Sequence, residues 1–257
     1  VLLRPRSPYA RTKAAAELLG QQAATRGLNV VRVRAFNHTG AGQPDFFVVS
    51  NFARQVARIQ LGRQEPVMRV GNLLSVRDFL HVDDVIRAYL ALIDPKVPAD
   101  VYNVASGRGV TIQEVLDRLT DLAGIHPRVE RDPERWRETD WLVGDPSRLE
   151  AATGWRAEIE LESILEELLG DWLSKEERAG RRAKARITHS SKARQRPIHS
   201  PVESSRLRRP ISTNPSRPNL SSTSRTSSKR RPARTRRPLR ETQPAICVAI
   251  GIISCLS

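Results

Sequence analysis

A tyrosine and a lysine four residues apart, Tyr9 and Lys13, stand near the start of this 257-residue chain. On a helix, residues at this spacing share one face, so the ammonium group lies beside the phenol. A neighbouring positive charge favours the phenolate and lowers a tyrosine pKa that is ordinarily near ~10. Such a tyrosine can exchange a proton with a substrate hydroxyl near neutral pH. The alternative is a half-buried tyrosine beside a solvated lysine on an amphipathic helix.

The elements that would position this pair alternate between helices and strands. Hydrophobic periodicity, caps and breakers predict a helix over residues 8–26, ended by Gly27, and a β-branched strand over 29–34. The loop over 36–44 then leaves the C-terminal end of that strand, where ligands sit in open parallel sheets. Further helices are predicted over 48–61, 83–93, 111–123, 146–153 and 161–175, and further strands over 67–70, 77–81, 101–104 and 128–131. The order indicates an α/β fold.

Four ordered motifs connect these elements to a known family. They are SPYARTKAAAE (7–17), RAFNHTGAGQ (34–43), RDFLHVDDV (77–85) and YNVASG (102–107). Their order and spacing closely resemble the extended short-chain dehydrogenase/reductase superfamily (NAD-dependent epimerases and dehydratases), and within it the GDP-mannose 4,6-dehydratase and GDP-4-keto-6-deoxymannose reductase branch. The resemblance runs from about residue 5 to about residue 172. It implies a nucleotide-sugar dehydratase or NAD(P)-dependent reductase, with another sugar epimerase or dehydratase as the alternative.

The resemblance also implies roles for the residues that could do chemistry. Tyr9 matches the catalytic acid/base, and Lys13 matches its partner, which hydrogen-bonds the nicotinamide ribose. His38 matches a contact to the nicotinamide cofactor, NADP or NAD; alternatively it is a loop histidine with ordinary partners. The dehydratase branch carries Glu-Ser and a following arginine pair after Asn-His. Here Thr39-Gly40 and Gln43 stand in those places, a pattern more similar to the reductase subgroup.

A second set of residues matches the family's contacts to its GDP-sugar substrate. It comprises Asn37, Val48, Asn51 and Arg77. The guanidinium of Arg77 suits phosphate and ribose oxygens better than a lysine would, although Asp78 beside it could instead make Arg77 a surface ion pair.

The family's second substrate-binding arginine comes from a later loop, which this chain matches less closely. Arg137 is the better match and Arg135 the alternative, because the family's proline is Glu138 here and the loop to Gly144 is about two residues short.

The resemblance implies a fold that this chain holds only in part. In the family a dinucleotide-binding half with a glycine-rich turn precedes the tyrosine, and no such fingerprint occurs here. We therefore expect a C-terminal fragment in residues 1–177: the C-terminal portion of a Rossmann-like doubly wound sheet plus a small α+β substrate-binding domain. An exposed sheet edge is expected. The full-length protein is expected to be a homo-oligomer.

Residues 178–257 differ sharply from the rest of the chain. They carry 20 of the 43 Lys and Arg residues and 2 of the 28 Asp and Glu residues, so the preceding body has a net charge of −3. No aromatic residue follows Trp172. We expect a disordered Arg/Ser/Pro-rich tail that adds nothing to the core. A rival function is a non-catalytic nucleic-acid-binding protein, since clustered arginines bind phosphate; a merely solvated or non-native tail is the favoured alternative.

Metal, membrane and secretion are not indicated. His81 with Asp83 and Asp84 suggests a metal site, but Asp83 suits a helix cap and Asp84 a partner of the helix dipole. The apolar run near residues 245–253 is shorter than the ~20 residues that span a bilayer. The body has no cysteine and no signal peptide opens the chain, so a cytoplasmic protein is expected.

Overall fold

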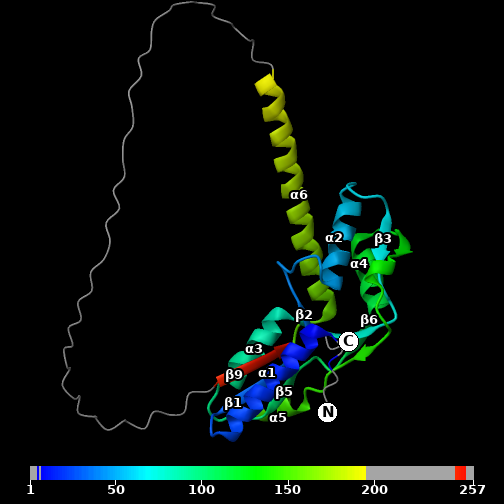
Figure 1. Cartoon of the computed structure of the whole chain (residues 1–257). Helices are drawn as coiled ribbons and strands as arrows, with labels where there is room; N and C mark the ends of the chain where they lie inside the picture. Colours follow the sequence, from blue (N-terminus) through cyan, green and yellow to red (C-terminus); the bar gives the residue numbers. More distant parts are fainter. Residues whose placement is uncertain (1–4, 6, 195–246, 253–257) are drawn as a thin grey trace, which may run out of the picture. The chain divides into compact units, whose positions relative to one another are not determined.

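The computed structural model describes residues 5, 7–194 and 247–252. The chain divides into two compact units, one formed by Val1–Arg186 with Gln243–Ser257 and the other by Ile187–Thr242. The site lies in the first unit, and Figure 1 labels many of its helices and strands. Most of the second unit falls outside the described residues.

The first sheet of this unit is parallel and has three strands. β1 (Val30–Ala35) pairs with β5 (Val101–Val104) on one edge and with β9 (Cys247–Ile252) on the other. Alternate residues of β1 point to one face, where Val31, Val33 and Ala35 are buried. α3 (Val82–Leu92) and α5 (Ser147–Thr153) contribute to the core on this face.

α1 (Pro8–Thr25) carries Tyr9 and packs against β1 and β9. Ser7 caps the helix by accepting a hydrogen bond from the Ala10 N–H at 3.1 Å. Of the α1 residues, all of them described, only Ala10 is buried. Arg34 of β1 donates to Glu17 of α1 at 2.9 and 2.6 Å. A capped N-terminus and one partly buried ion pair thus hold a helix that has little buried apolar surface.

A second set of strands continues from β1. β2 (Asn37–Thr39) pairs in parallel with β4 (Val76–His81), which also pairs with β6 (Gly109–Thr111) and β8 (Trp141–Leu142). The sequence predicted a loop at 36–44, and this was wrong for residues 37–39. Three residues are too few for a periodic signal, and partners far along the chain stabilise the strand.

The second core lies between α2 (Val48–Gln60), α4 (Ile112–Ala123), α6 (Leu161–Arg194) and β3 (Val67–Val70). β7 (Arg128–Arg131) pairs in parallel with β3 and leads into the 3-10 helix η1 (Pro133–Arg135). Thr111 and Glu114 form a capping box at the start of α4, as the sequence predicted. This core supports the strands and loops that carry the arginines of the site.

The structure describes two elements that reach into or lie within residues 178–257, α6 and β9. α6 does not end near Lys175 but continues to Arg194. Just past the predicted end, the buried Glu176 pairs with Arg54, Arg58 and Arg63. β9 pairs with β1 over six residues, so in the described residues β1 has a strand on both of its edges. The rest of the expected tail lies outside the described residues.

Candidate active site

Two adjoining cavities lie where β2, the start of α2 and η1 meet. The first, the tyrosine pocket, has a volume of about 330 Å³, and the second, the arginine pocket, about 440 Å³. Phe46 and Val48 line both. The tyrosine pocket also contains Tyr9, Asn37, His38, Thr39, Gln43, Phe47, Val49 and Phe79. The arginine pocket also contains Asp45, Asn51, Phe52, Gly71, Asn72, Ser75, Arg77, Ile112, Glu134, Arg135 and Arg137.

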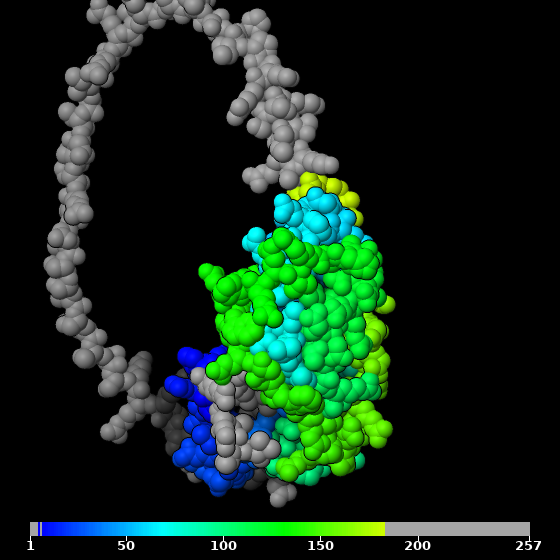
Figure 2. Space-filling model, turned by 90° about the vertical axis from the view of Figure 1, so that its right-hand side faces the viewer, coloured from blue at the N-terminus to red at the C-terminus, as the bar shows by residue number. Residues whose placement is uncertain are grey.

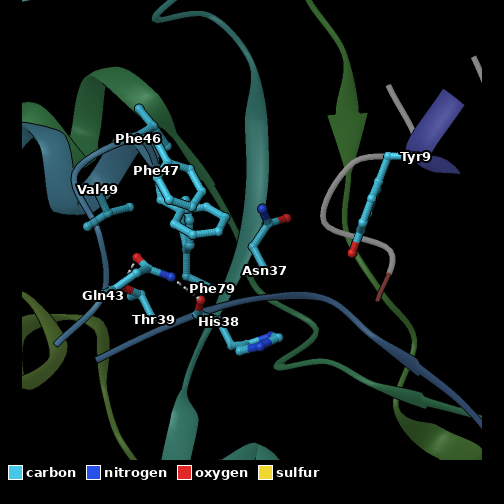
Figure 3. Close-up of a pocket in the computed structure, with 10 residues that line it drawn as sticks. Tyr9, Asn37, His38, Thr39, Gln43, Phe46, Phe47, Val49 and Phe79 are labelled. Atoms are coloured by element: carbon cyan, nitrogen blue, oxygen red, sulfur yellow. Dashed lines mark hydrogen bonds between the residues drawn. The ribbon is translucent and has the colours of Figure 1, made fainter. Parts of the chain in front are cut away.

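Tyr9 and Lys13 form the pair that their spacing predicts. The Lys13 ammonium lies 5.4 Å from the centre of the Tyr9 ring. The side chain of Tyr9 lines the tyrosine pocket from α1, across from the Phe46–Phe47 pair (Figure 3). Tyr9 is 42% exposed, so this phenol is accessible to a ligand.

β2 places Asn37 and His38 in the same pocket (Figure 3). His38 Nδ1 lies 2.9 Å from the Phe36 carbonyl oxygen. Because a carbonyl only accepts, the proton is on Nδ1, and Nε2 is the ring nitrogen that can accept from a ligand. Asn37 Oδ1 is buried and accepts no hydrogen bond from the described residues. A buried acceptor of this kind is completed by a ligand donor such as a hydroxyl group.

The loop after β2 is held by two carboxylates that the sequence analysis did not single out. Glu167 accepts from the Ala41 N–H at 2.8 Å, and Asp171 accepts from the Gly42 N–H at 2.9 Å. Both belong to α6, more than 120 residues away along the chain. Burial alone would raise the pKa of the Asp171 carboxyl. Hydrogen bonds from Lys175 and from the Gly42 N–H outweigh that effect, so the pKa is lowered.

The same loop fixes the polar wall of the tyrosine pocket. Gln43 accepts from the Thr39 hydroxyl at 2.6 Å and donates to the His38 carbonyl at 3.0 Å. The Ser50 hydroxyl donates to the Gln43 carbonyl at 2.7 Å. Gln43 therefore has a positioning role that the motif alone did not indicate.

Part of the wall of the tyrosine pocket is aromatic. The Phe46 and Phe47 rings lie 4.3 Å apart and Phe46 is 77% exposed. Phe79 of β4 lies in the same pocket. These rings were missed from the sequence because adjacent phenylalanines before a helix also suit a core.

Arg77 lies in the arginine pocket, where its carboxylate partner is not the expected alternative. Asp78 is fully buried on the other face of β4 and accepts hydrogen bonds from Ser106, Gly107 and Gly144. Arg77 Nη2 instead lies 2.6 Å from Asp140 Oδ1. The Arg77 side chain lines the arginine pocket, as a substrate-binding arginine requires.

Arg135 and Arg137 both line the arginine pocket, so both alternatives for the second arginine are present. Arg135 donates to Asn51 Oδ1 at 2.7 Å, and Arg137 donates to two backbone carbonyls at 3.2 and 2.7 Å. Their segment packs on the loop after β3, where a Cβ on Gly71 would lie 2.4 Å from the Arg135 carbonyl oxygen. Figure 2 shows this face, with residues 130–140 in green beside the cyan surface near residue 70.

Two of the predicted contacts belong to α2. Val48 is its first residue and lines both pockets, and Phe47 provides no side-chain cap. The positive N-terminal end of the helix therefore lies at the two pockets. Asn51 is engaged by protein groups: it donates to the Asp45 carbonyl and accepts from Gln55 and Arg135. Asn51 thus positions Arg135, and its direct contact with a ligand stays a prediction.

The histidine that suggested a metal has a structural role. His81, not Asp83, is the N-cap of α3: its Nδ1 accepts from the Asp83 N–H at 3.2 Å. Its Nε2 then carries the proton and donates to Glu167 at 2.9 Å. Within residues 5, 7–194 and 247–252, no three His, Cys, Asp or Glu side chains cluster so as to hold a metal ion. None of the helices described there combines the length and apolar character that crossing a bilayer requires.

Comparison with known proteins identifies relatives of this chain. The family model described as GDP-mannose 4,6 dehydratase matches residues 2–168. GDP-6-deoxy-D-mannose reductase of Pseudomonas aeruginosa is 41% identical over 174 residues, which are 66% of this chain and 57% of that protein. GDP-mannose 4,6 dehydratase 2 of Arabidopsis thaliana is 30% identical over 172 residues, which are 65% of this chain and 46% of that protein.

Solved structures show the same relationship. The structure of RMD from Pseudomonas aeruginosa complexed with NADPH has a TM-score of 0.61 at 41% identity and covers 66% of this chain and 58% of its own. The structure of Thermus thermophilus UDP-glucose 4-epimerase in complex with NAD has a TM-score of 0.56 at 29% identity. The match covers 66% of this chain and 55% of the epimerase chain. This chain spans about half the length of the curated relatives it matches. The predicted resemblance is confirmed: the chain belongs to the GDP-mannose 4,6-dehydratase family.

Proposed function

We propose that this chain supplies the acid–base group and the substrate-binding surface of an NAD(P)-dependent enzyme acting at C4 of a GDP-linked hexose. One observation carries the proposal. Tyr9, with the Lys13 ammonium beside its ring, shares a pocket with Asn37, whose buried Oδ1 accepts no hydrogen bond from the described residues. This pocket adjoins a second one that contains Arg77, Arg135 and Arg137. A proton-transfer group next to a sugar-binding amide and a cluster of guanidinium groups suits a sugar linked to a diphosphate.

The two pockets would divide the substrate between them. The hexose occupies the tyrosine pocket, where Asn37 Oδ1 accepts from a sugar hydroxyl and Phe46 and Phe47 cover the apolar face. The diphosphate lies across the start of α2, where the helix N-terminus at Val48 favours negative charge. Arg77 and the arginines near η1 bind the diphosphate and ribose. Binding remote from the reacting carbon orients C4 toward Tyr9.

The residues of the tyrosine pocket fit the nicotinamide end of a dinucleotide. Tyr9 and Lys13 would hold its ribose, and His38 Nε2 is the ring nitrogen left for a ligand. When bound, the cofactor supplies or accepts the hydride at C4. In the reductive direction Tyr9 Oη gives its proton to the C4 oxygen, and Lys13 stabilises the phenolate that remains.

Two observations favour reduction of a GDP-4-keto-6-deoxyhexose over dehydration of GDP-mannose, the other activity that the resemblance implies. The chain is 41% identical to a GDP-6-deoxy-D-mannose reductase and 30% identical to a GDP-mannose 4,6 dehydratase. Thr39 and Gln43, which distinguish the reductase-like motif, bond to each other in the pocket wall. We retain a homo-oligomeric, cytoplasmic enzyme as the expected setting. The rival nucleic-acid-binding role depends on tail residues that mostly fall outside those described.

The test is product analysis with an active protein that contains this chain. It is incubated with GDP-4-keto-6-deoxymannose and NADPH, and separately with GDP-mannose and NADP⁺. We expect loss of NADPH absorbance and a product two mass units heavier in the first reaction only. Loss of water from GDP-mannose in the second would instead assign the dehydratase activity. No turnover of either sugar, by a folded protein that binds NADPH, would contradict both.

A further inference from the structure

Asp140 lies against the arginine pocket without being one of the residues expected to bind substrate. It directly precedes β8, which pairs in parallel with β4 so that Trp141 lies opposite Val76. The Val76 N–H donates to the Asp140 carbonyl at 2.9 Å. This backbone bond places the Asp140 carboxylate beside the guanidinium of Arg77, with Nη2 and Oδ1 separated by 2.6 Å.

The ion pair is partly shielded from water. The Arg77 side chain is 14% exposed and that of Asp140 is 22% exposed. At such exposure the attraction between opposite charges is stronger than at an open surface, and salt screens it less. The negative charge of Asp140 therefore offsets part of the electrostatic potential of the Arg77 guanidinium.

The carboxylate is not what orients Arg77. Nη1 donates to the Val76 carbonyl at 2.9 Å and lies 3.4 Å from the Asp140 carbonyl oxygen. Both acceptors belong to the backbone and persist if the carboxylate is replaced. Asp140 Oδ1 is buried, and among the residues that the structure describes, Arg77 included, it has no hydrogen-bond partner of good geometry. Asp140 thus contributes chiefly a negative charge.

We propose that Asp140 is an internal counter-ion that competes with the phosphate groups of the ligand for Arg77. This rests on the proposed function, because it requires that the arginine pocket bind a nucleoside diphosphate. A diphosphate brings more than one negative charge and also contacts Arg135 and Arg137, so it displaces the carboxylate. A ligand of lower charge competes less well, and Asp140 thereby sets the charge selectivity of the pocket.

Calorimetric titration of the full chain with GDP, GMP and guanosine tests this role. Asp140→Asn keeps the size of the side chain and removes its charge. We expect GDP to bind about three- to tenfold more tightly to this variant at low ionic strength. The gain is smaller for GMP, absent for guanosine, and reduced at high salt.

Matched variants separate this effect from others. Glu160→Gln removes the carboxylate of an exposed ion pair with Arg108, outside the lining of both pockets, and leaves GDP affinity unchanged. In an Arg77→Ala background, Asp140→Asn gives a smaller gain, because the cation for which it competes is gone. Thermal unfolding confirms that each variant is folded.

The outcomes distinguish this inference from the proposed function. Unchanged or weaker GDP binding by Asp140→Asn, when the wild-type chain binds GDP, overturns the role of Asp140 and leaves the proposed function standing. An equal gain for guanosine also overturns it, since charge is then not the cause. If no folded variant binds GDP, the proposed substrate is wrong and the role of Asp140 falls with it.

Discussion

The two pockets of the site are supported very differently. The acid–base pair of the tyrosine pocket stands on α1, in which only Ala10 is buried and which Glu17 ties to β1. The arginine pocket shares Phe52 and Ile112 with the larger core. Hydrogen bonds also join Arg135 to Asn51, Asn72 to Thr139, and Arg77 to the backbone just before β8. The acid–base pair is therefore held in place by one helix with few buried contacts, whereas the arginine pocket is held by a core and a network of hydrogen bonds.

This difference separates the two tasks of the site. Binding needs cations held in fixed positions, and the arginine pocket provides them through strands and a supporting core. Proton transfer needs a hydroxyl whose position depends on α1. We infer that ligand affinity is the more robust property of this chain and that acid–base competence is the more easily lost.

The largest expected effect comes from a substitution that disables proton transfer in the tyrosine pocket and leaves the arginine pocket intact. Tyr9→Phe removes the proton-transfer hydroxyl and keeps the ring, so kcat should fall about 10²–10⁴-fold while GDP binding is retained. Steady-state kinetics of an active protein that contains this chain measures the first, and calorimetry of the chain measures the second. Tyr89→Phe, outside both pockets, is the matched control. A kcat near the wild-type value would remove Tyr9 from the mechanism.

The next effect tests how far the tyrosine side depends on β9. Deleting residues 243–257 leaves one edge of β1 unpaired and removes a contact of α1. We expect a loss of about 2–3 kcal/mol, seen as a fall in Tm of roughly 5–10 °C, with self-association through the open edge. Hydrogen exchange should rise more in α1 than in α2.

A shorter deletion is the control for that experiment. Removing residues 253–257 leaves β9 whole and should change neither Tm nor oligomeric state. The sequence analysis expected a tail without influence on the core, and an unchanged Tm after deletion of 243–257 would restore that expectation.

The sequence predicted the long elements of the fold well and missed the short ones. The helices and strands with a clear period, such as β1, α2 and the capped α4, lie within one or two residues of their predicted bounds. The short strands β2, β6 and β8 were missed, because two or three residues carry no period and their stability comes from distant partners.

The site shows the same limit. Tyr9, Asn37 and Arg77 stand in local motifs and were identified. Asp140 and Asp171 act through contacts across the fold, at 63 or more residues of separation. No local sequence pattern indicates such contacts, so only a structure could reveal that Arg77 forms an ion pair with Asp140.

A substitution in the arginine pocket, at Asn72, tests whether that pocket can be weakened without affecting the tyrosine pocket. Asn72 is buried and its amide donates to the Arg137 carbonyl at 2.9 Å and to Thr139 Oγ1 at 2.8 Å. Asn72→Ala leaves the segment that carries Arg137 without these bonds. We expect GDP affinity to fall by about 1–3 kcal/mol, because two hydrogen bonds that hold the segment carrying Arg137 are lost.

The same variant should spare the tyrosine side. Hydrogen exchange of α1 is expected to remain at the wild-type rate, and kcat at saturating substrate should change far less than in Tyr9→Phe. Equal losses of binding and of kcat would show that the two pockets are not independently supported.

The smallest effect concerns the loop between the two pockets and depends on pH. Hydrogen bonds from Lys175 and the Gly42 N–H outweigh burial and place the pKa of Asp171 below its usual 3.8 in the folded chain. A carboxylate with a lowered folded-state pKa binds fewer protons folded than unfolded, so its stabilisation is complete above the unfolded pKa and is lost as pH falls through the folded pKa. Asp171→Asn should therefore lower the free energy of unfolding by about 0.5–1.5 kcal/mol at pH 7 and flatten its decline below about pH 5. Denaturant unfolding between pH 7 and pH 3 measures both. An unaltered acid slope would mean that the loop is held by Glu167 alone, and the pocket wall would then depend on a single carboxylate of α6.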